Sequence, residues 1–503
     1  MKTLLEIAGI LTRKKIARIE ILDEQVLKQK DSKFGKFYEG LLTGKIETDE
    51  DAASLLYENG DTSDAKYRQI KSRFRRRLLN TLFFLDVNTP AAASYEQAYI
   101  SCNKELTLVE ILLSHQANHS AAILCRQILT TALKFNFTEL ILKTARHLRR
   151  LAVLEEDEKG FNYYNDITLK YALIYEAELQ AEHFSLAALD IYQRSLCRRD
   201  CIEQLSTYAN QLVKLSEKHA SPRINFQMFY VWSMYYELLY DYEGVLEVCS
   251  NAKQYFDDHK NLFSNQEQSI FTLKTLSAYF HLNKYEEGRI HAENNLTELS
   301  EEMPQWIDFM EYYLLLSLKT LHIINAIAIF NKVTGSVIFK KLDEDRREKW
   351  ELFEAALHYL IDKEKMNPML LPRQRRKTFK VSDFINRPVN YPARLNILYL
   401  QRLTFQILFL LQRKSHQGIT ERIQRLINLS KYELKKEGYE RAYFFVKQLQ
   451  QLEKSNYSIK NLRINTKYLN KIKNIPFIYR GKIAELEVLP YEQLWQFMIQ
   501  HLE

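Results

Sequence analysis

The segment 229-FYVWSMYY-236 is the most informative about the fold, because its pattern occurs twice more further along the chain. Looser copies stand at 273-LKTLSAYF-280 and 313-YLLLSLKT-320. Each copy places one serine among bulky apolar residues: Ser233, Ser277 and Ser317. Apolar residues spaced by three and four positions predict that every copy forms a helix. A pattern that returns about every forty residues indicates an array of similar helical units.

A second pattern follows each copy and predicts the partner helix of a hairpin. It begins at Tyr242, Tyr285 and Ile323, which are 43 and 38 residues apart. Three further residues follow at offsets of three, seven and ten in every copy: Val245, Cys249 and Ala252; Gly288, Ala292 and Asn295; Ala326, Phe330 and Val333. These offsets lie on one face of a helix. We therefore expect loops of variable length between helices whose packing positions are constant.

Together the two patterns resemble a tetratricopeptide (TPR) repeat, whose first helix reads large, large, small, aromatic. Four residues match that helix in full: Phe229, Trp232, Ser233 and Tyr236. Asn295 at an inner position, the missing closing proline and the long units depart from the family pattern. The resemblance implies an all-α, right-handed superhelical solenoid of antiparallel helix pairs. It also implies a concave surface that binds a protein or peptide, and it implies no catalytic residue.

The composition favours the same fold class. Glycine occurs 12 times and proline 9 times in 503 residues, well below their usual shares of about 7% and 5%, so few tight turns and few strands are expected. The hydrophobic share of 46% is ample for a continuous core. The five cysteines form no even framework and no C-x-x-C pair, which indicates a reducing, cytoplasmic location. Abundant Lys, Ile, Asn and Tyr favour a bacterial source.

No segment has the pattern of a secretion signal or a membrane span. The N-terminus lacks a small-residue cleavage site ahead of its first basic residues. The most apolar segment, 395–411, carries Gln401, Arg402 and Gln406 in its middle. A helix that crosses a bilayer would have to bury these three side chains in lipid. We therefore expect no membrane partner.

Charge divides the chain into three parts, which we take as the expected domains. Residues 1–90 carry a formal charge of +3, residues 91–365 carry −10 and residues 366–503 carry +15. The parts correspond to a helical N-terminal region with a basic helix, the TPR-like array, and a basic helical C-terminal region that caps the array. Three roles fit the basic C-terminal part: it binds a polyanion, it attracts an acidic protein, or it neutralises the acidic array within the molecule.

Further helices are predicted from the spacing of apolar residues and from N-terminal capping signals. Thr48, followed three residues later by Asp51, is typical of a capping box at the start of a helix. A longer helix is expected at 63–85. The remaining expected helices are 106–114, 121–135, 138–154, 163–180, 186–195, 202–218, 394–411, 420–436 and 439–453, with a last one from about 491.

The candidate binding residues form two basic runs and one aromatic side chain on the last expected helix. The first run, 66–77, lies on the helix expected at 63–85, and the second lies in an irregular segment at 367–390. The candidates are Arg73, Arg75, Arg76 and Arg77; Arg373, Arg375, Arg376 and Lys377; and Trp495. Each also fits a purely structural role, as a solvated helix face, a connector or a cap of the array.

Three hypotheses about function follow. The resemblance favours a non-catalytic scaffold or adaptor that binds a protein or peptide in the concave groove of the array. The basic helix and the basic C-terminal region favour a nucleic-acid-associated regulatory protein. The third is an all-helical enzyme with a scattered site. The sequence offers no motif for a catalytic, metal or cofactor site, since Gly40–Ile46 is one residue short of a phosphate-binding loop and ends on isoleucine instead of a hydroxyl.

Overall fold

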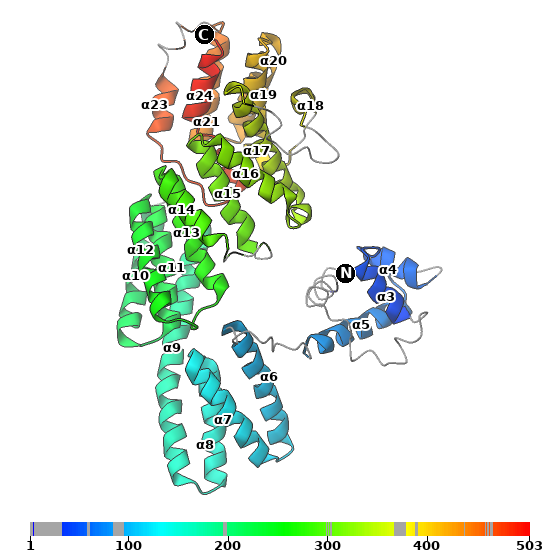
Figure 1. The fold of residues 1–503 in the computed structure, drawn as a ribbon, viewed down its shortest axis with the longest axis vertical. Coiled ribbons are helices and arrows are strands. Elements are labelled where there is room, and N and C mark those ends of the chain that lie inside the picture. The colour runs from blue at the N-terminus through cyan, green and yellow to red at the C-terminus, as the bar shows by residue number, and fades with distance from the viewer. Residues whose placement is uncertain are drawn as a thin grey trace. The chain divides into compact units, whose positions relative to one another are not determined.

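In the computed structural model, every regular element among the described residues is a helix (Figure 1). The described residues are 4, 33–57, 61–83, 95–194, 199–297, 299, 301, 304–366, 379–387, 391–436, 438–457, 459, 462 and 466–502. The expected all-helical class is confirmed for these residues. Contacts divide the chain into two compact units, Met1–Thr168 and Leu169–Glu503. The three-part division by charge stays a prediction, because it rests on charge and not on contacts.

The first unit contains two groups of helices. Its helices are α3 (Lys33–Leu42), α4 (Asp49–Leu56), α5 (Ala65–Phe83), α6 (Tyr95–Ser114), α7 (Asn118–Phe135) and α8 (Thr138–Leu154). α3 to α5 share a small core that includes Phe37, Tyr67 and Phe74. The predicted capping box of α4 is confirmed: the Asp51 carboxylate accepts the backbone N–H of Thr48 at 2.9 Å, and the Thr48 hydroxyl accepts that of Asp51 at 3.2 Å.

One long helix, α9 (Glu158–Arg194), replaces two predicted ones. The prediction of separate helices at 163–180 and 186–195 was wrong, because the residues between them contain neither glycine nor proline. Ala181 and Ser185 are buried there, so the buried face of the helix continues through this stretch. The same residue types that mark a short polar connection also fit a continuous helix.

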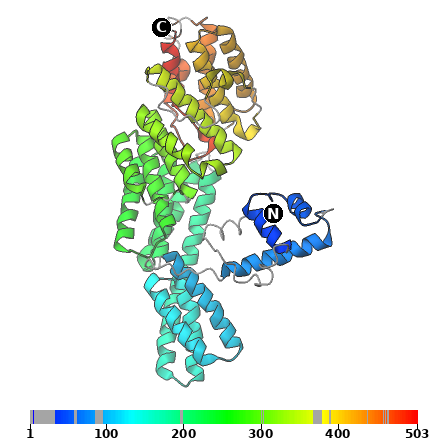
Figure 2. The same cartoon turned by 45° about the vertical axis from the view of Figure 1, so that its right-hand side comes forward.

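The second unit continues with helices that pack mainly against their neighbours in the chain. They are α10 (Arg199–Lys218), α11 (Pro222–Leu238), α12 (Tyr242–Asp258), α13 (Asn265–Leu282), α14 (Tyr285–Asn295), α15 (Pro304–Lys319), α16 (Ile323–Gly335), α17 (Glu344–Lys363), α18 (Val381–Asn386), α19 (Asn396–Gln412), α20 (His416–Tyr432), α21 (Glu440–Lys454), α23 (Lys467–Lys473) and α24 (Tyr491–Gln500). Short 3-10 turns lie at Phe339–Lys341, Ala393–Leu395 and Ile483–Glu485. Figures 1 and 2 both show α11 to α16 packed side by side.

The repeated sequence positions occupy equivalent places in α11 to α16. Ser233, Ser277 and Ser317 are all buried, on α11, α13 and α15. The hydroxyls of Ser233 and Ser317 donate to backbone carbonyls of their own helices. Each buried hydroxyl therefore has a hydrogen-bond partner within its own helix. The second helices, α12, α14 and α16, bury their repeated positions as well, except for the half-buried Asn295. The sequence repeat is therefore a packing repeat.

Two ring stacks recur between successive hairpins. Tyr242 at the start of α12 stacks on His281 with 4.1 Å between ring centroids, and Tyr285 at the start of α14 stacks on His322 at 3.3 Å. Each tyrosine begins a second helix, and each histidine lies near the end of the next pair's first helix or in the turn that follows it. The stacks therefore join neighbouring helix pairs. This contact supports the repeat independently of the serine positions.

The two helices of each pair are joined by a tight turn in which no glycine is used. Tyr240, Asn283 and Leu321 have φ values of 60°, 58° and 61°, a left-handed conformation that ordinarily favours glycine. The residue after each donates its N–H to the carbonyl five residues earlier, at 2.8 to 3.1 Å, as in a Schellman turn. The low glycine content therefore does not prevent tight turns, contrary to what the composition suggested.

Gly288 on α14 lies close to side chains of α13 and α15, and replacing it is a test of the packing. A Cβ atom there would lie 2.4 Å from Leu316 Cδ2 and 3.2 Å from Tyr279 Cβ. We expect Gly288→Val to lower the free energy of unfolding by about 1–3 kcal/mol, because a well-packed site must shift to admit the side chain. Gly335→Val is the matched control, since a Cβ there meets nothing within 4 Å. Equal urea midpoints for the two variants would contradict this packing.

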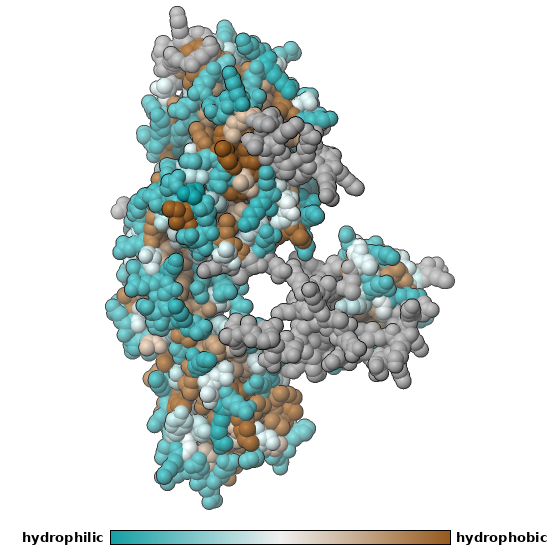
Figure 3. All heavy atoms as spheres, in the orientation of Figure 1, coloured by the Kyte–Doolittle hydropathy of each residue, from teal (hydrophilic) through white to brown (hydrophobic). Residues whose placement is uncertain are grey.

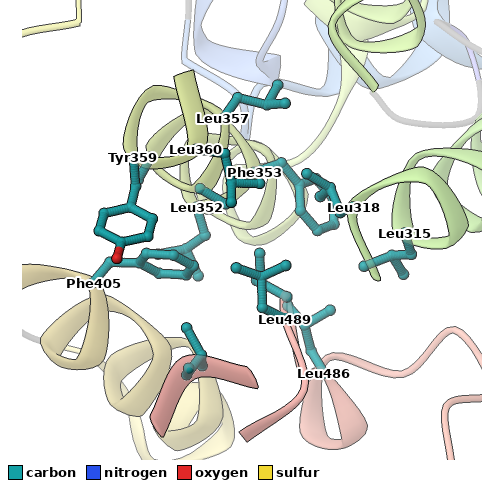
Figure 4. Close-up of a cluster of buried hydrophobic side chains, with 14 of the residues drawn as sticks. Leu315, Leu318, Leu352, Phe353, Leu357, Tyr359, Leu360, Phe405, Leu486 and Leu489 are labelled. Carbon is teal, nitrogen blue, oxygen red and sulfur yellow. The ribbon is translucent and has the colours of Figure 1, made fainter. Parts of the chain in front are cut away.

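The C-terminal helices build the largest core of the unit. Buried leucines and aromatic residues from α15, α17, α19 and the chain before α24 meet there (Figure 4). Gln401, Arg402 and Gln406 of α19 are all buried in it, and each has protein partners. No described helix combines the length and the apolar character that a membrane span requires.

Candidate binding surfaces

A polar pocket of about 470 Å³ lies between α12, α13 and α14. We call it the amide pocket, because side-chain amides contribute much of its wall. Its polar residues are Lys253, Asp257, Asn265, Gln268, Ser269, Thr272, Thr275, His291, Asn294 and Asn295. The inner apolar wall comes from Phe256, Phe271 and Leu299, which are all buried. Figure 3 shows hydrophilic residues over much of the visible surface of these helices.

Three amides of this pocket are available to a ligand. Asn265, Gln268 and Asn294 are exposed, and their side chains make no hydrogen bond within the described part of the chain. A fourth amide, Asn295, donates to the carbonyl of His291 at 2.7 Å, which leaves its own oxygen as an acceptor. An amide carries both a donor and an acceptor, so it can pair with both groups of a peptide bond.

His291 adds a neutral group to the wall of the amide pocket. Its Nε2 lies 2.9 Å from the carbonyl oxygen of Thr272. Burial lowers the pKa of this histidine, the hydrogen bond to Thr272 opposes the shift, and the charge of Lys253 adds to it. The imidazole is therefore neutral near pH 7 and donates from Nε2, which leaves Nδ1 as an acceptor. Lys253 and Asp257 provide one charge of each sign, so the wall carries no strong net charge.

The C-terminal strap, residues 475–490, covers a different part of the same unit (Figure 1). The carbonyl of Tyr479 accepts hydrogen bonds from His281 at 3.0 Å and from Tyr312 at 3.1 Å. Burial lowers the pKa of His281 to about 3, so this contact uses a neutral imidazole. Arg480 and Lys482 donate to backbone carbonyls near the end of α9, at 2.9 and 2.7 Å. The strap is thus bound to residues of α9, α13 and α15.

A second cavity, of about 280 Å³, lies beside the strap, and its arginines are already paired. Arg441 binds Glu487 at 2.7 Å and Glu492 at 2.9 Å, and Arg480 binds Glu485 at 2.6 Å. A charged ligand would have to displace these ion pairs, whose members are largely buried. For this reason we regard the amide pocket as the better candidate.

The basic run of α5 is only partly exposed to solvent. Arg73, Arg75 and Arg76 are exposed, whereas Arg77 is half-buried with its guanidinium 4.7 Å from the centre of the Phe34 ring. Lys71 is bound to Asp49 at 2.5 Å. The run therefore divides into side chains that hold the small N-terminal core together and side chains that face solvent.

The remaining sequence candidates come from the C-terminal part of the chain. Arg373, Arg375, Arg376 and Lys377 lie outside the described residues. Trp495 is 1% exposed and fills the core around α24, so its ring is not accessible to a partner in this structure. Its role as a cap of the array stays a prediction.

Arginines of the basic C-terminal part pair with carboxylates of α17. Arg394 binds Asp345 at 2.9 Å, and Arg387 binds Glu351 at 3.2 Å. Arg402, at 1% exposure, binds Glu348 and Glu351. α17 belongs to the acidic stretch 91–365. Of the three roles that fitted the basic block, neutralisation within the molecule is the one that these contacts support.

The described part of the chain brings together neither a set of metal-ligating side chains nor a set of reactive thiols. No group of three or more His, Cys, Asp or Glu side chains there is placed to hold a metal ion. Cys102 and Cys125 are buried and unpaired. Burial, with smaller contributions from Glu105 and Glu110, raises the pKa of both thiols to about 11, so they are protonated near neutral pH.

Comparison with known proteins adds no assignment to these surfaces. No protein-family model, curated protein or solved structure matches the chain.

Proposed function

We propose that this protein is a TPR-like scaffold or adaptor, in which antiparallel helix pairs form a right-handed array that holds a segment of another protein. The buried serines, the small positions of the second helices and the two tyrosine–histidine stacks support the repeat. The unpaired, protonated thiols support a reducing compartment such as the cytoplasm. The scaffold is non-catalytic, and its partner is a protein or peptide.

The amide pocket is the observation that carries the proposal. An extended peptide presents one N–H and one C=O per residue, and unpaired amides at Asn265, Gln268 and Asn294 can bind both. The buried Phe256 and Phe271 give an apolar side chain of the same peptide a place to pack. A pocket with one charge of each sign favours a mixed-charge or neutral segment over a strongly acidic or basic one.

Selection from a random peptide library tests the proposal. We expect enriched peptides to lose affinity by about tenfold or more for the double variant Gln268→Ala/Asn294→Ala, because two sets of hydrogen bonds of about 0.5–1.5 kcal/mol each are removed. The matched control is Gln254→Ala/Gln266→Ala, whose residues are exposed on α12 and α13 but do not line the pocket. Fluorescence anisotropy with labelled peptides gives the affinities.

Two outcomes of the selection would overturn the peptide site. One is that no peptide is enriched on the wild-type protein. The other is that enriched peptides bind the pocket variant and the control variant equally well. Because all four substituted side chains are exposed, circular dichroism melts are expected to be the same for the two variants, which separates lost binding from lost folding.

A further inference from the structure

We propose that the solvent face of α5 binds the phosphate backbone of a nucleic acid. This function is additional to the peptide site, since it uses a different helix in the other compact unit. The cations that carry it are Lys66, Arg68, Arg73, Arg75 and Arg76, all of which are exposed.

The five cations occupy one half of the helix. Tyr67 and Phe74 are buried on the opposite side, where they pack in the core of α3 to α5. Arg68 and Arg75 are seven residues apart, so they lie almost in line along the helix and about 10 Å from each other. The other three cations spread over the rest of the solvent face, at about 100° per residue. A backbone that follows α5 thus meets several positive charges in succession.

These cations are free to bind a ligand. In the part of the chain that the structure describes, the side chains of all five make no hydrogen bond or ion pair. α5 itself contains no acidic residue, and Asp64 precedes its first turn. Lys71 and Arg77, in contrast, serve the fold through Asp49 and Phe34. The helix therefore separates its structural cations from its solvent-facing ones, which a uniformly solvated basic helix would not need to do.

The chemistry of this face fits nucleic acid better than an anionic membrane. A helix that lies on a bilayer inserts an apolar face into it, but the apolar face of α5 is used in the N-terminal core. The exposed residues described on α5 are polar apart from Ala65 and Leu79. Phosphodiesters require only positive charge along a line, because backbone contacts position a protein on nucleic acid without reading its sequence. DNA and RNA share that chemistry.

Binding of full-length protein to labelled duplex DNA and single-stranded RNA of about 20 units, measured by anisotropy between about 50 and 200 mM salt, tests the proposal. We expect the wild-type affinity to fall steeply with salt. Arg68→Ala/Arg75→Ala should lower the slope of log K against log salt by about 2, at about 1 per lost phosphate contact, and weaken binding about tenfold or more. The Arg68→Lys/Arg75→Lys variant should keep the slope, because the charge remains.

The control removes the same charge elsewhere in the same unit. Arg146 and Arg150 are exposed on α8, and we expect Arg146→Ala/Arg150→Ala to bind like the wild type. Equal losses in the α5 and α8 variants would mean that only net charge matters and would overturn the assignment to α5. No binding by the wild type to either nucleic acid, or binding to anionic vesicles alone, would also overturn it. Stronger binding to one probe identifies DNA or RNA as the source of the phosphates.

Discussion

Replacing Arg402 with methionine is expected to lower the free energy of unfolding by about 3 kcal/mol. The guanidinium is 1% exposed and binds two carboxylates of α17, those of Glu348 and Glu351. Breaking a buried pair from one side costs about 3–5 kcal/mol, because the remaining charge loses its buried partner. Among the described residues, Glu351 would keep only Arg387, whose side chain is 60% exposed. The side chains of Glu348 and Glu351 are 16% and 26% exposed, so water relieves part of the penalty and the lower end of that range applies.

The matched control for Arg402 is Arg394→Met, which removes another arginine from an ion pair with the same helix. Arg394 is 68% exposed where it binds Asp345, and exposed pairs contribute at most about 1 kcal/mol. All four tryptophans lie in the second compact unit, so urea unfolding followed by their fluorescence reports on this unit. Similar midpoints for the two variants would show that burial of Arg402 has no energetic consequence.

Replacing Tyr479 with alanine is expected to destabilise the second unit by about 3–5 kcal/mol, the usual cost of truncating a buried aromatic residue. Tyr479 is 1% exposed at the centre of the C-terminal strap. Its hydroxyl donates to Glu311, which also binds Lys349, and its ring lies 5.5 Å from that of Tyr312. The substitution therefore removes both packing and a buried hydrogen bond from the contact between strap and array.

Two further variants identify the cause of the loss at Tyr479. Tyr479→Phe keeps the ring and should cost only about 1.5–3 kcal/mol, the value of a hydrogen bond to a charged group. Tyr432→Ala truncates a tyrosine that is 77% exposed and should leave the urea midpoint nearly unchanged. A Tyr479→Ala variant as stable as Tyr432→Ala would mean that the strap is not docked on the array.

The sequence predicted most of the local structure, because helices are encoded by neighbouring residues. The helix expected at 138–154 is observed with the same bounds, and the capping box at Thr48 was readable from two residues. The repeated serines are buried as the pattern required. α3 was missed, although Phe34, Phe37 and Leu41 have helical spacing. A periodicity count over 33–42 would have found it.

The surfaces were much harder to predict, because they depend on contacts between distant residues. His281 meets Tyr479 across 198 positions, and no local pattern indicates that pairing. From the sequence, Arg402 indicates only that its segment does not span a membrane. The fold places it against Glu348 and Glu351. One feature of the sequence pattern coincides with the amide pocket. Asn295, which departs from the repeat at an inner position, is one of the residues that line it.

Affinity purification of the full-length protein from its native cell, with and without nuclease, tests the central claim that the array holds a protein segment in the amide pocket. We expect a protein partner that is still recovered after nuclease treatment, is lost with Gln268→Ala/Asn294→Ala and is retained with Gln254→Ala/Gln266→Ala. Recovery of the same partner by the pocket variant, or loss of that partner on nuclease treatment, would contradict it.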